Sequence, residues 1–395
     1  MSYHMHLETI VLRNLRIWDG LDWVDGDRIV VQGGRIAAVG EAPERIPETA
    51  AIDCGGAVAI PGLIDAHVHM ELNPEHTRPP KATDLTQRPD MDRRARAMVE
   101  AGITTARDLG GGAWLELGLR DDIAAGHIAG PRLLCAGQPV TSPGGHCHFW
   151  GGEAADLDQA KAVLARQVEK GVDLIKVMAS GGRMTRGSDP ASAQFDLDTL
   201  RGVVETATKH GLPVAAHCHG TAAIELAARA GVRTIEHCSW VGPEGWASDY
   251  QDAVARIILE RGAWVSPTIN RGWQRFLTGG GTPTLARIRR AFSAMQSLGI
   301  PLAASTDAGI PGVFHQDLPL ALAVFSRIAQ LTPAATLRAA TSEAARALGL
   351  EGITGRLAPG YEADILIVDG DPLTNLEALG RPVGVWARGR SIREP

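Results

Sequence analysis

Apolar and polar positions alternate along residues 7–60, in runs that are rich in β-branched side chains and are interrupted by Gly-Gly pairs. Alternation with a period of two residues predicts short strands, and the Gly-Gly pairs predict tight hairpin turns. The same pattern returns in the C-terminal stretches GRLAPGYEADILIVDG and VGVWARGRSI. Because neither end has an obvious core of its own, we expect residues 1–60 and 352–395 to form one composite β-sandwich.

Between these ends, short apolar runs alternate with stretches of helical period. The eight runs are VAIPGLIDAHVH, GITTARDLG, RLLCAGQPVT, VDLIKVMASGG, LPVAAHCHG, RTIEHCS, AWVSPTI and PLAASTDAG. The helical stretches, such as DLDQAKAVLARQVEKG, close on Gly as helix C-termini often do, and two more helices are predicted at DLPLALAVFSRIAQ and PAATLRAATSEAARALG. Eight strands with crossover helices predict an α/β fold, a (β/α)8 TIM barrel over residues 61–351 with a small flanking β-sandwich formed by both termini.

The composition excludes several classes of protein. Hydrophobic residues make up 45% of the chain and charged residues 21%, and the mean hydropathy is -0.03, which is typical of globular proteins. A net charge of -6 with scattered Lys and Arg offers no basic stripe, so neither nucleic acid nor a membrane surface is an expected partner. Five cysteines without paired spacing favour a reducing compartment, and MSYHMHLETI lacks the pattern of a secretory signal, so we expect a cytoplasmic protein.

Polar residues recur where the predicted strands end, which is the face of a barrel that carries active sites. They are His67 and His69 after the first run, Lys176 in the fourth, His217 in the fifth, His237 in the sixth and Asp307 in the eighth. A period of two places His67 and His69 on the same strand face, where they can share one cation. Any one of these histidines is as readily a hydrogen-bonded packing residue, but together they are nitrogen and oxygen donors suited to Zn²⁺ or a similar divalent ion.

Lys176 departs from this pattern, because an ammonium group among metal cations is repelled and a neutral amine is a poor ligand. Carbamylation by CO2 resolves the conflict, since it converts the lysine into an anionic ligand.

The sequence resembles the amidohydrolase superfamily, and within it the binuclear subtype with a carbamylated lysine. The resemblance is carried by HxH in PGLIDAHVH, the lysine strand DLIKVMASGG, the histidines of VAAHCHG and TIEHCSW, and the aspartate of STDAG, and it covers essentially the whole chain. It implies that His67, His69 and Asp307 hold one metal, that His217 and His237 hold a second, and that carbamylated Lys176 bridges both. It also implies that a hydroxide shared by two divalent ions, with zinc as the expected metal, attacks the substrate, with Asp307 as general base and His237 assisting the oxyanion.

Two loops resemble the imidazolonepropionase-related group, which includes Xaa-Pro and Xaa-Arg dipeptidases and ochratoxin-type amidases. In TSPGGHCHFWGG, His146 matches a histidine that the resemblance implies contacts the substrate, whereas His148 is interpreted as a surface residue. In SGGRMTRGSDP the related peptidases tend to read GGVxSPxDP, and this departure argues against a standard dipeptide substrate. Arg183 in this loop is a candidate clamp for a substrate carboxylate or else a solvated charge, and Arg186 is interpreted as solvated.

Other candidates near the site have packing alternatives of equal weight. His219 is interpreted as a substrate contact or a support for the ligands, and Cys218 and Cys238 as packing residues. Trp150 is a candidate substrate contact. Together with Trp114, Trp240 and Trp273 it suggests an aromatic pocket, and the alternative is that these tryptophans pack the loops.

The sequence therefore predicts a binuclear metallohydrolase that cleaves an amide-type C–N bond in a small molecule such as an N-acyl amino acid, a dipeptide or a related carboxylated amide. One alternative is an imidazolonepropionase-like hydrolase of cyclic amides, ureas or carbamates. A second alternative is a non-catalytic scaffold, which predicts missing ligand positions, whereas all six are present. Soluble enzymes commonly form symmetric oligomers, which is consistent with a homo-oligomer, but no residue of this sequence specifies its interface.

Overall fold

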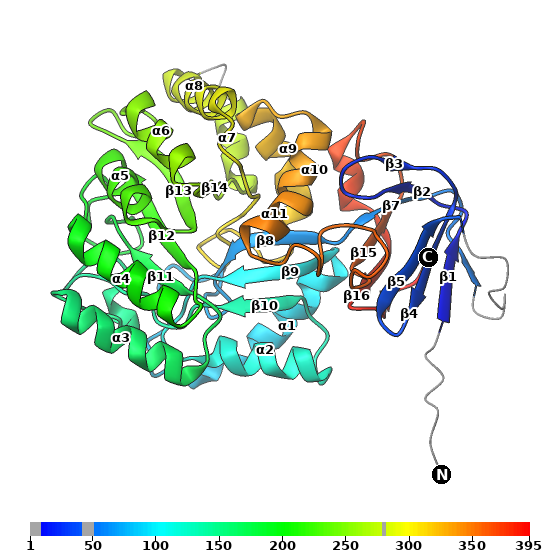
Figure 1. The fold of residues 1–395 in the computed structure, drawn as a ribbon, viewed down its shortest axis with the longest axis horizontal. Helices are drawn as coiled ribbons and strands as arrows, with labels where there is room; N and C mark the ends of the chain where they lie inside the picture. The colour runs from blue at the N-terminus through cyan, green and yellow to red at the C-terminus, as the bar shows by residue number, and fades with distance from the viewer. Residues whose placement is uncertain (1–8, 42–50, 279–281) are drawn as a thin grey trace, which may run out of the picture.

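The computed structural model describes residues 9–41, 51–278 and 282–395 (Figure 1). Strands from both ends of the chain form two sheets on one side of the molecule. The first sheet has the order β5 (Arg35–Gly40), β4 (Arg28–Gln32), β1 (Thr9–Arg13), β6 (Ala51–Asp53). The second has the order β17 (Arg390–Arg393), β16 (Pro382–Ala387), β15 (Ile365–Val368), β7 (Val58–Pro61), β2 (Arg16–Trp18), β3 (Trp23–Val24). C-terminal strands thus pair with N-terminal ones.

A buried apolar cluster joins side chains of these two sheets. Leu12 and Ile29 from the first sheet belong to the same cluster as Ile365, Ile367 and Trp386 from the second. Their alternate positions along each strand place them on one face, as the period of two requires. The exact domain boundary between residues 60 and 61 stays a prediction, and it falls inside β7.

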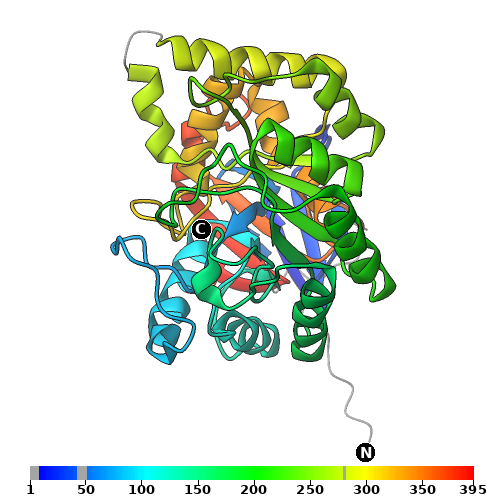
Figure 2. The ribbon, with the colours of Figure 1, turned by 90° about the vertical axis from the view of Figure 1, so that its left-hand side faces the viewer.

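The remaining strands are parallel and lie inside a layer of helices, in a TIM-barrel-like α/β arrangement (Figures 1 and 2). One sheet has the order β10 (Arg132–Cys135), β9 (Ile103–Asp108), β8 (Leu63–Val68), and the other has the order β11 (Ile175–Met178), β12 (Val214–Gly220), β13 (Thr234–Val241), β14 (Trp264–Ser266). Six of these seven strands lie within the corresponding predicted runs, and β13 extends beyond its run to Val241.

The eighth predicted run, residues 301–309, is not a regular strand. Among the described residues it forms only isolated parallel bridges, Leu302 with Val265, Ala308 with Val68 and Ala308 with Ile310, so the two sheets do not close into one hydrogen-bonded barrel. Asp307 has φ 63°, a left-handed conformation that interrupts an extended ladder. Its N–H nevertheless donates to the His67 carbonyl (2.9 Å), which holds Asp307 beside the first barrel strand.

The helices follow the predicted strand-to-helix alternation. They are α1 (Arg88–Glu100), α2 (Leu115–Ala125), α3 (Leu157–Lys170), α4 (Leu197–Lys209), α5 (Thr221–Ala230), α6 (Asp252–Glu260), α7 (Gln274–Thr278), α8 (Pro283–Leu298), α9 (Leu318–Ala329), α10 (Pro333–Ala339) and α11 (Ser342–Ala347). Short 3-10 helices are η2 (Leu85–Gln87), η3 (His148–Trp150), η4 (Arg271–Trp273) and η5 (Leu376–Gly380).

One helix prediction needs correction. The stretch PAATLRAATSEAARALG forms two helices, α10 and α11, because Thr341 leaves the helical region at φ -138°, ψ -97°. Across the described residues, none of the helices has both the length and the apolar character that a membrane crossing requires.

Candidate metal centre

The first donor group lies where β8 meets the residues of the eighth run. His67 Nε2 and His69 Nε2 are 3.3 Å and 3.4 Å from Asp307 Oδ1, and the two imidazole nitrogens are 3.3 Å apart. Both histidines are buried. Three donor atoms at these separations from one another form a set that one divalent cation could occupy.

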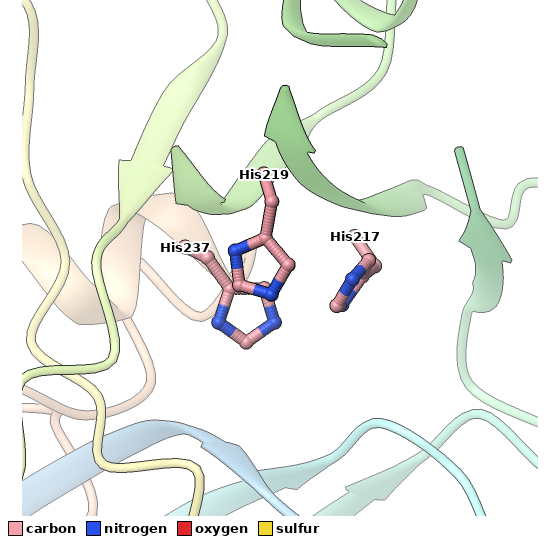
Figure 3. A group of neighbouring side chains, drawn as sticks. All are labelled: His217, His219 and His237. Atoms are coloured by element: carbon pink, nitrogen blue, oxygen red, sulfur yellow. The ribbon is translucent and has the colours of Figure 1, made fainter. Parts of the chain in front are cut away.

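The second donor group consists of His217, His219 and His237 (Figure 3). His217 and His219 come from β12 and His237 comes from β13, and each pair of ring centroids is 4.5 Å apart. The two groups adjoin each other, since the His67 and His237 ring centroids are 5.0 Å apart.

Each histidine of the second group uses one ring nitrogen in a hydrogen bond to the protein. His217 Nε2 contacts the Gly181 carbonyl (3.0 Å), His237 Nδ1 contacts Thr268 Oγ1 (2.8 Å) and His219 Nδ1 contacts Ser239 Oγ (2.9 Å). The other ring nitrogen is left for a ligand. This division of the ring nitrogens is the usual arrangement around metal-ligating histidines, because the outer hydrogen bond orients the ring.

The two histidines of the first group are also oriented by a hydrogen bond from one ring nitrogen each. His67 Nδ1 lies 2.9 Å from Glu236 Oε2, and the Arg107 guanidinium donates to Glu236 Oε1 (2.7 Å). His69 Nδ1 lies 2.7 Å from the Gly110 carbonyl. Although burial raises the pKa of the Glu236 carboxyl, the charge of Arg107 and the hydrogen bond with His67 bring it well below its usual range. A buried anion therefore orients the His67 ring.

Electrostatics keep these donors in the protonation states that a cation needs. Burial, with the charge of Lys176, lowers the pKa of His67 to about 4, and burial lowers the pKa of His219 to about 3. Burial raises the pKa of Asp307, but the opposing effects of His67, His69 and Lys176 leave it below the ordinary value. Neutral imidazoles and an ionised carboxylate fit divalent ions such as Zn²⁺.

Lys176 lies on β11 and lines the same cavity as both donor groups. The residue is 1% exposed, and burial lowers the pKa of its amine to about 8. The cavity has a volume of about 610 Å³, which is ample for a small-molecule substrate. A sequence model of the Amidohydrolase family matches residues 58–392, which span both donor groups and Lys176.

The chain belongs to the amidohydrolase family. Among curated relatives, ochratoxinase of Aspergillus niger is 27% identical over 380 residues, covering 86% of this chain and 76% of the relative. Imidazolonepropionase of Chloroflexus aggregans is 26% identical over 418 residues, covering 92% and 90%. A crystal structure of a prolidase complexed with N-methylphosphonate-L-proline superposes with a TM-score of 0.84 at 25% identity, covering 98% of this chain and 100% of the other. These relatives confirm the predicted resemblance, including the imidazolonepropionase and dipeptidase-related group.

The substrate residues predicted for this amidohydrolase fall in different places. His146 and Arg183 line the cavity, with the His146 ring centroid 4.6 Å from that of His217. His219, predicted as a support or substrate contact, lies beside His217 and His237 in the second donor group, and its role stays a prediction. Trp150 is fully buried beside His69, with ring centroids 5.5 Å apart, and lies outside the cavity lining, so its substrate contact stays a prediction.

Of the other candidate tryptophans in the amidohydrolase, Trp273 lines the cavity, whereas Trp240 is buried against Tyr250 at 4.8 Å between ring centroids. Trp114 directly precedes α2 and packs against Gly137, outside the cavity lining. Cys218 and Cys238 are buried, as expected of packing residues.

Sequence reasoning missed four residues that build this amidohydrolase site. Glu236 and Arg107 form the buried pair behind His67, and Trp246 and Phe276 line the cavity. A signal existed for the first pair, because a charged residue inside an apolar barrel strand needs a partner in a neighbouring strand. Trp246 and Phe276 lie in connections whose direction only the folded chain defines.

Proposed function

We propose that this amidohydrolase hydrolyses an amide-type C–N bond with the help of two divalent cations, zinc being the best match to the donors. The observation that carries the proposal is the pair of adjacent buried donor groups that share one cavity with Lys176. The named activities of the relatives, ochratoxinase, imidazolonepropionase and prolidase, support a C–N bond as the target.

His67, His69 and Asp307 would hold one ion, and His217 and His237 the other. Lys176, as a carbamate formed with CO2, would bridge the two. Its burial supports this role, because a buried lysine tends to be neutral and a neutral amine can attack CO2. When bound, divalent cations supply Lewis acidity, which polarises a carbonyl group and makes water more acidic.

The chain's own residues would handle the proton and the substrate. Asp307 would accept a proton from the attacking water and pass it to the leaving nitrogen, since its carboxylate belongs to the first donor group and lines the cavity. His237 would help to stabilise the oxyanion. The candidate substrate contacts are His146, Arg183, His219 and Trp150. The substrate class is an N-acyl amino acid, a dipeptide or a related carboxylated amide.

A second candidate is hydrolysis of a cyclic amide, urea or carbamate. It is favoured by the imidazolonepropionase relative, whose match covers 92% of this chain and 90% of its own. Complete donor groups argue against the non-catalytic scaffold, because a scaffold has no need of buried, neutral imidazoles facing a cavity.

The test measures metal content and turnover together. Metal-reconstituted protein is expected to contain two equivalents of divalent ion and to hydrolyse N-acyl amino acids or dipeptides, with both properties lost on chelation. Asp307→Asn should reduce kcat by about a hundredfold or more, because the general base is lost. Turnover of ring compounds alone would favour the second candidate, and an active enzyme without metal that ignores chelators would overturn the proposal.

The bridging role of Lys176 has its own variant. Lys176→Ala is expected to bind fewer than two metal equivalents and to lose most activity, whereas Lys161→Ala, a substitution of an exposed lysine on α3, should retain both. Full turnover with two equivalents of metal in Lys176→Ala would contradict the bridge.

A further inference from the structure

Three aromatic side chains form a continuous surface along one side of the cavity. This aromatic wall consists of Trp246, after β13, Trp273, in η4, and Phe276, in α7. The ring centroids of Trp246 and Trp273 are 6.4 Å apart, and those of Trp273 and Phe276 are 5.5 Å apart. These spacings are typical of interacting aromatic rings, so the wall is a connected apolar surface beside the donor groups.

Trp246 contacts both a histidine of the second donor group and the guanidinium of Arg183. Its ring centroid lies 5.0 Å from that of His219 on one hand and 5.2 Å from the Arg183 guanidinium on the other. Arg183 therefore lies within two ring contacts of the candidate ligands. A group held by Arg183 would be close enough to belong to the same small molecule as the labile bond.

The charge around the cavity favours an anionic ligand. In the described part of the chain, no carboxylate forms an ion pair with Arg183 or with Arg275, which stacks over Phe276 at 4.8 Å. Asp307 is the one acidic residue among the described lining residues, and it already belongs to the first donor group. Two arginines without acidic partners beside an apolar surface leave room for a substrate carboxylate.

We propose that the aromatic wall and Arg183 select amides that carry an aromatic group and a carboxylate, the ring packing on the wall and the carboxylate binding the guanidinium. This inference rests on the proposed hydrolysis and specifies its substrate. Trp246 acts as a positioning residue, because its indole holds the guanidinium on one face of the site.

The test uses ligands that cannot be hydrolysed, so that it does not depend on turnover. The probe is 4-oxo-4-phenylbutanoate, in which a CH2 group replaces the amide NH of an N-benzoyl amino acid. Its methyl ester lacks the charge, and 4-oxopentanoate lacks the ring. Dissociation constants are measured by calorimetry on metal-reconstituted protein, with tryptophan fluorescence as a second signal.

We expect the phenyl acid to bind more tightly than both comparison compounds. Arg183→Gln should weaken the phenyl acid about tenfold or more and leave the ester nearly unchanged, because a charge-assisted hydrogen bond is lost. Trp246→Leu should weaken the phenyl acid about three- to tenfold, and 4-oxopentanoate less. Arg186→Gln, which changes an exposed arginine of the same loop outside the lining, is the matched control.

Metal content and thermal unfolding of each variant identify any protein that fails to fold, and Trp246→Phe replaces Trp246→Leu if it does. Equal binding of the phenyl acid by Arg183→Gln and Arg186→Gln, or equal affinity for the phenyl acid and 4-oxopentanoate, would overturn the inference. Selective binding of the phenyl acid without any amide turnover would support the ligand preference of the aromatic wall and contradict the proposed hydrolysis. Failure of the inference and failure of the proposed function therefore give different results.

Discussion

Glu116 illustrates how burial and neighbouring charges act on a single residue. Its side chain is fully buried in the first turn of α2, near Glu71. Glu71 accepts hydrogen bonds from the N–H groups of Gly112 (2.8 Å), Ala113 (3.1 Å) and Leu115 (3.1 Å). Burial, and then the charges of Glu71 and Asp108, raise the pKa of Glu116 well above its ordinary value, so Glu116 keeps its proton.

Glu116→Gln is therefore expected to change the pH dependence of stability. Above pH 4.5, the ordinary pKa of a glutamate side chain, the unfolded chain releases this proton while the folded chain retains it, so the native protein loses stability as the pH rises. Because the variant has no proton to release at this position, its stability relative to the native protein should rise with pH, by at most about 1.4 kcal/mol per pH unit.

Urea unfolding between pH 5 and 8 measures this difference, with the exposed Glu100→Gln as control for the substitution itself. Parallel stability curves for the native protein and Glu116→Gln would contradict the assignment.

At the scale of elements, the turn after the eighth run positions the first donor group. Gly309 has φ 108°, and a Cβ at this position would lie 2.5 Å from the backbone oxygen of His69. The N–H of Gly309 donates to the Val313 carbonyl (2.9 Å), which closes the turn. The turn thus needs glycine both for its left-handed backbone and for its close approach to a candidate ligand.

Gly309→Ala should lower the free energy of unfolding by more than the cost of left-handed backbone alone. Gly312→Ala is the matched control, because Gly312 also has a positive φ (78°) but has open space where a Cβ would lie. We expect about 1–2 kcal/mol for the control and a larger loss for Gly309→Ala, measured by urea unfolding. An equal loss in both variants would show that the close approach to His69 does not add to the cost of the substitution.

At the scale of the whole molecule, an ionic network joins the barrel strands to the terminal sheet. Arg132, at the start of β10, donates to Asp364 Oδ2 (3.2 Å) and also contacts Glu362. Asp364 is buried and also accepts hydrogen bonds from Thr354 Oγ1 (2.7 Å) and the Arg388 N–H (2.9 Å). This carboxylate connects segments far apart in the sequence.

Arg132→Met should destabilise the protein by about 3 kcal/mol, because it leaves a buried carboxylate without its cation. Arg16→Met, which breaks the 2.9 Å pair of Arg16, in β2, and Asp371, after β15, should cost less than about 1 kcal/mol, since the Arg16 side chain is 55% exposed. Thermal and urea unfolding measure the loss of stability in each variant. Equal losses would mean that burial does not decide the strength of this junction.

Much of the fold followed from local pattern. Seven of the eight predicted barrel runs contain strands, because alternation and apolar character are written along the chain itself. The eighth failed where Asp307 adopts a left-handed backbone and donates its N–H to the carbonyl of the distant His67, features that no local pattern indicates. The helix predicted over residues 333–349 failed for a similar reason, since Thr341 breaks a continuous helical pattern.

The sequence by itself indicated the candidate metal-binding residues, because His67, His69, Lys176, His217, His237 and Asp307 each follow or lie in a recognisable apolar run. Only the tertiary structure decided that His219 lies in the second donor group and that Trp246 packs against the Arg183 guanidinium. It also decided that the ion pair of Glu236 and Arg107 lies behind His67. The physical reason is that period and composition act between neighbours in the chain, whereas these contacts depend on how distant strands and loops pack.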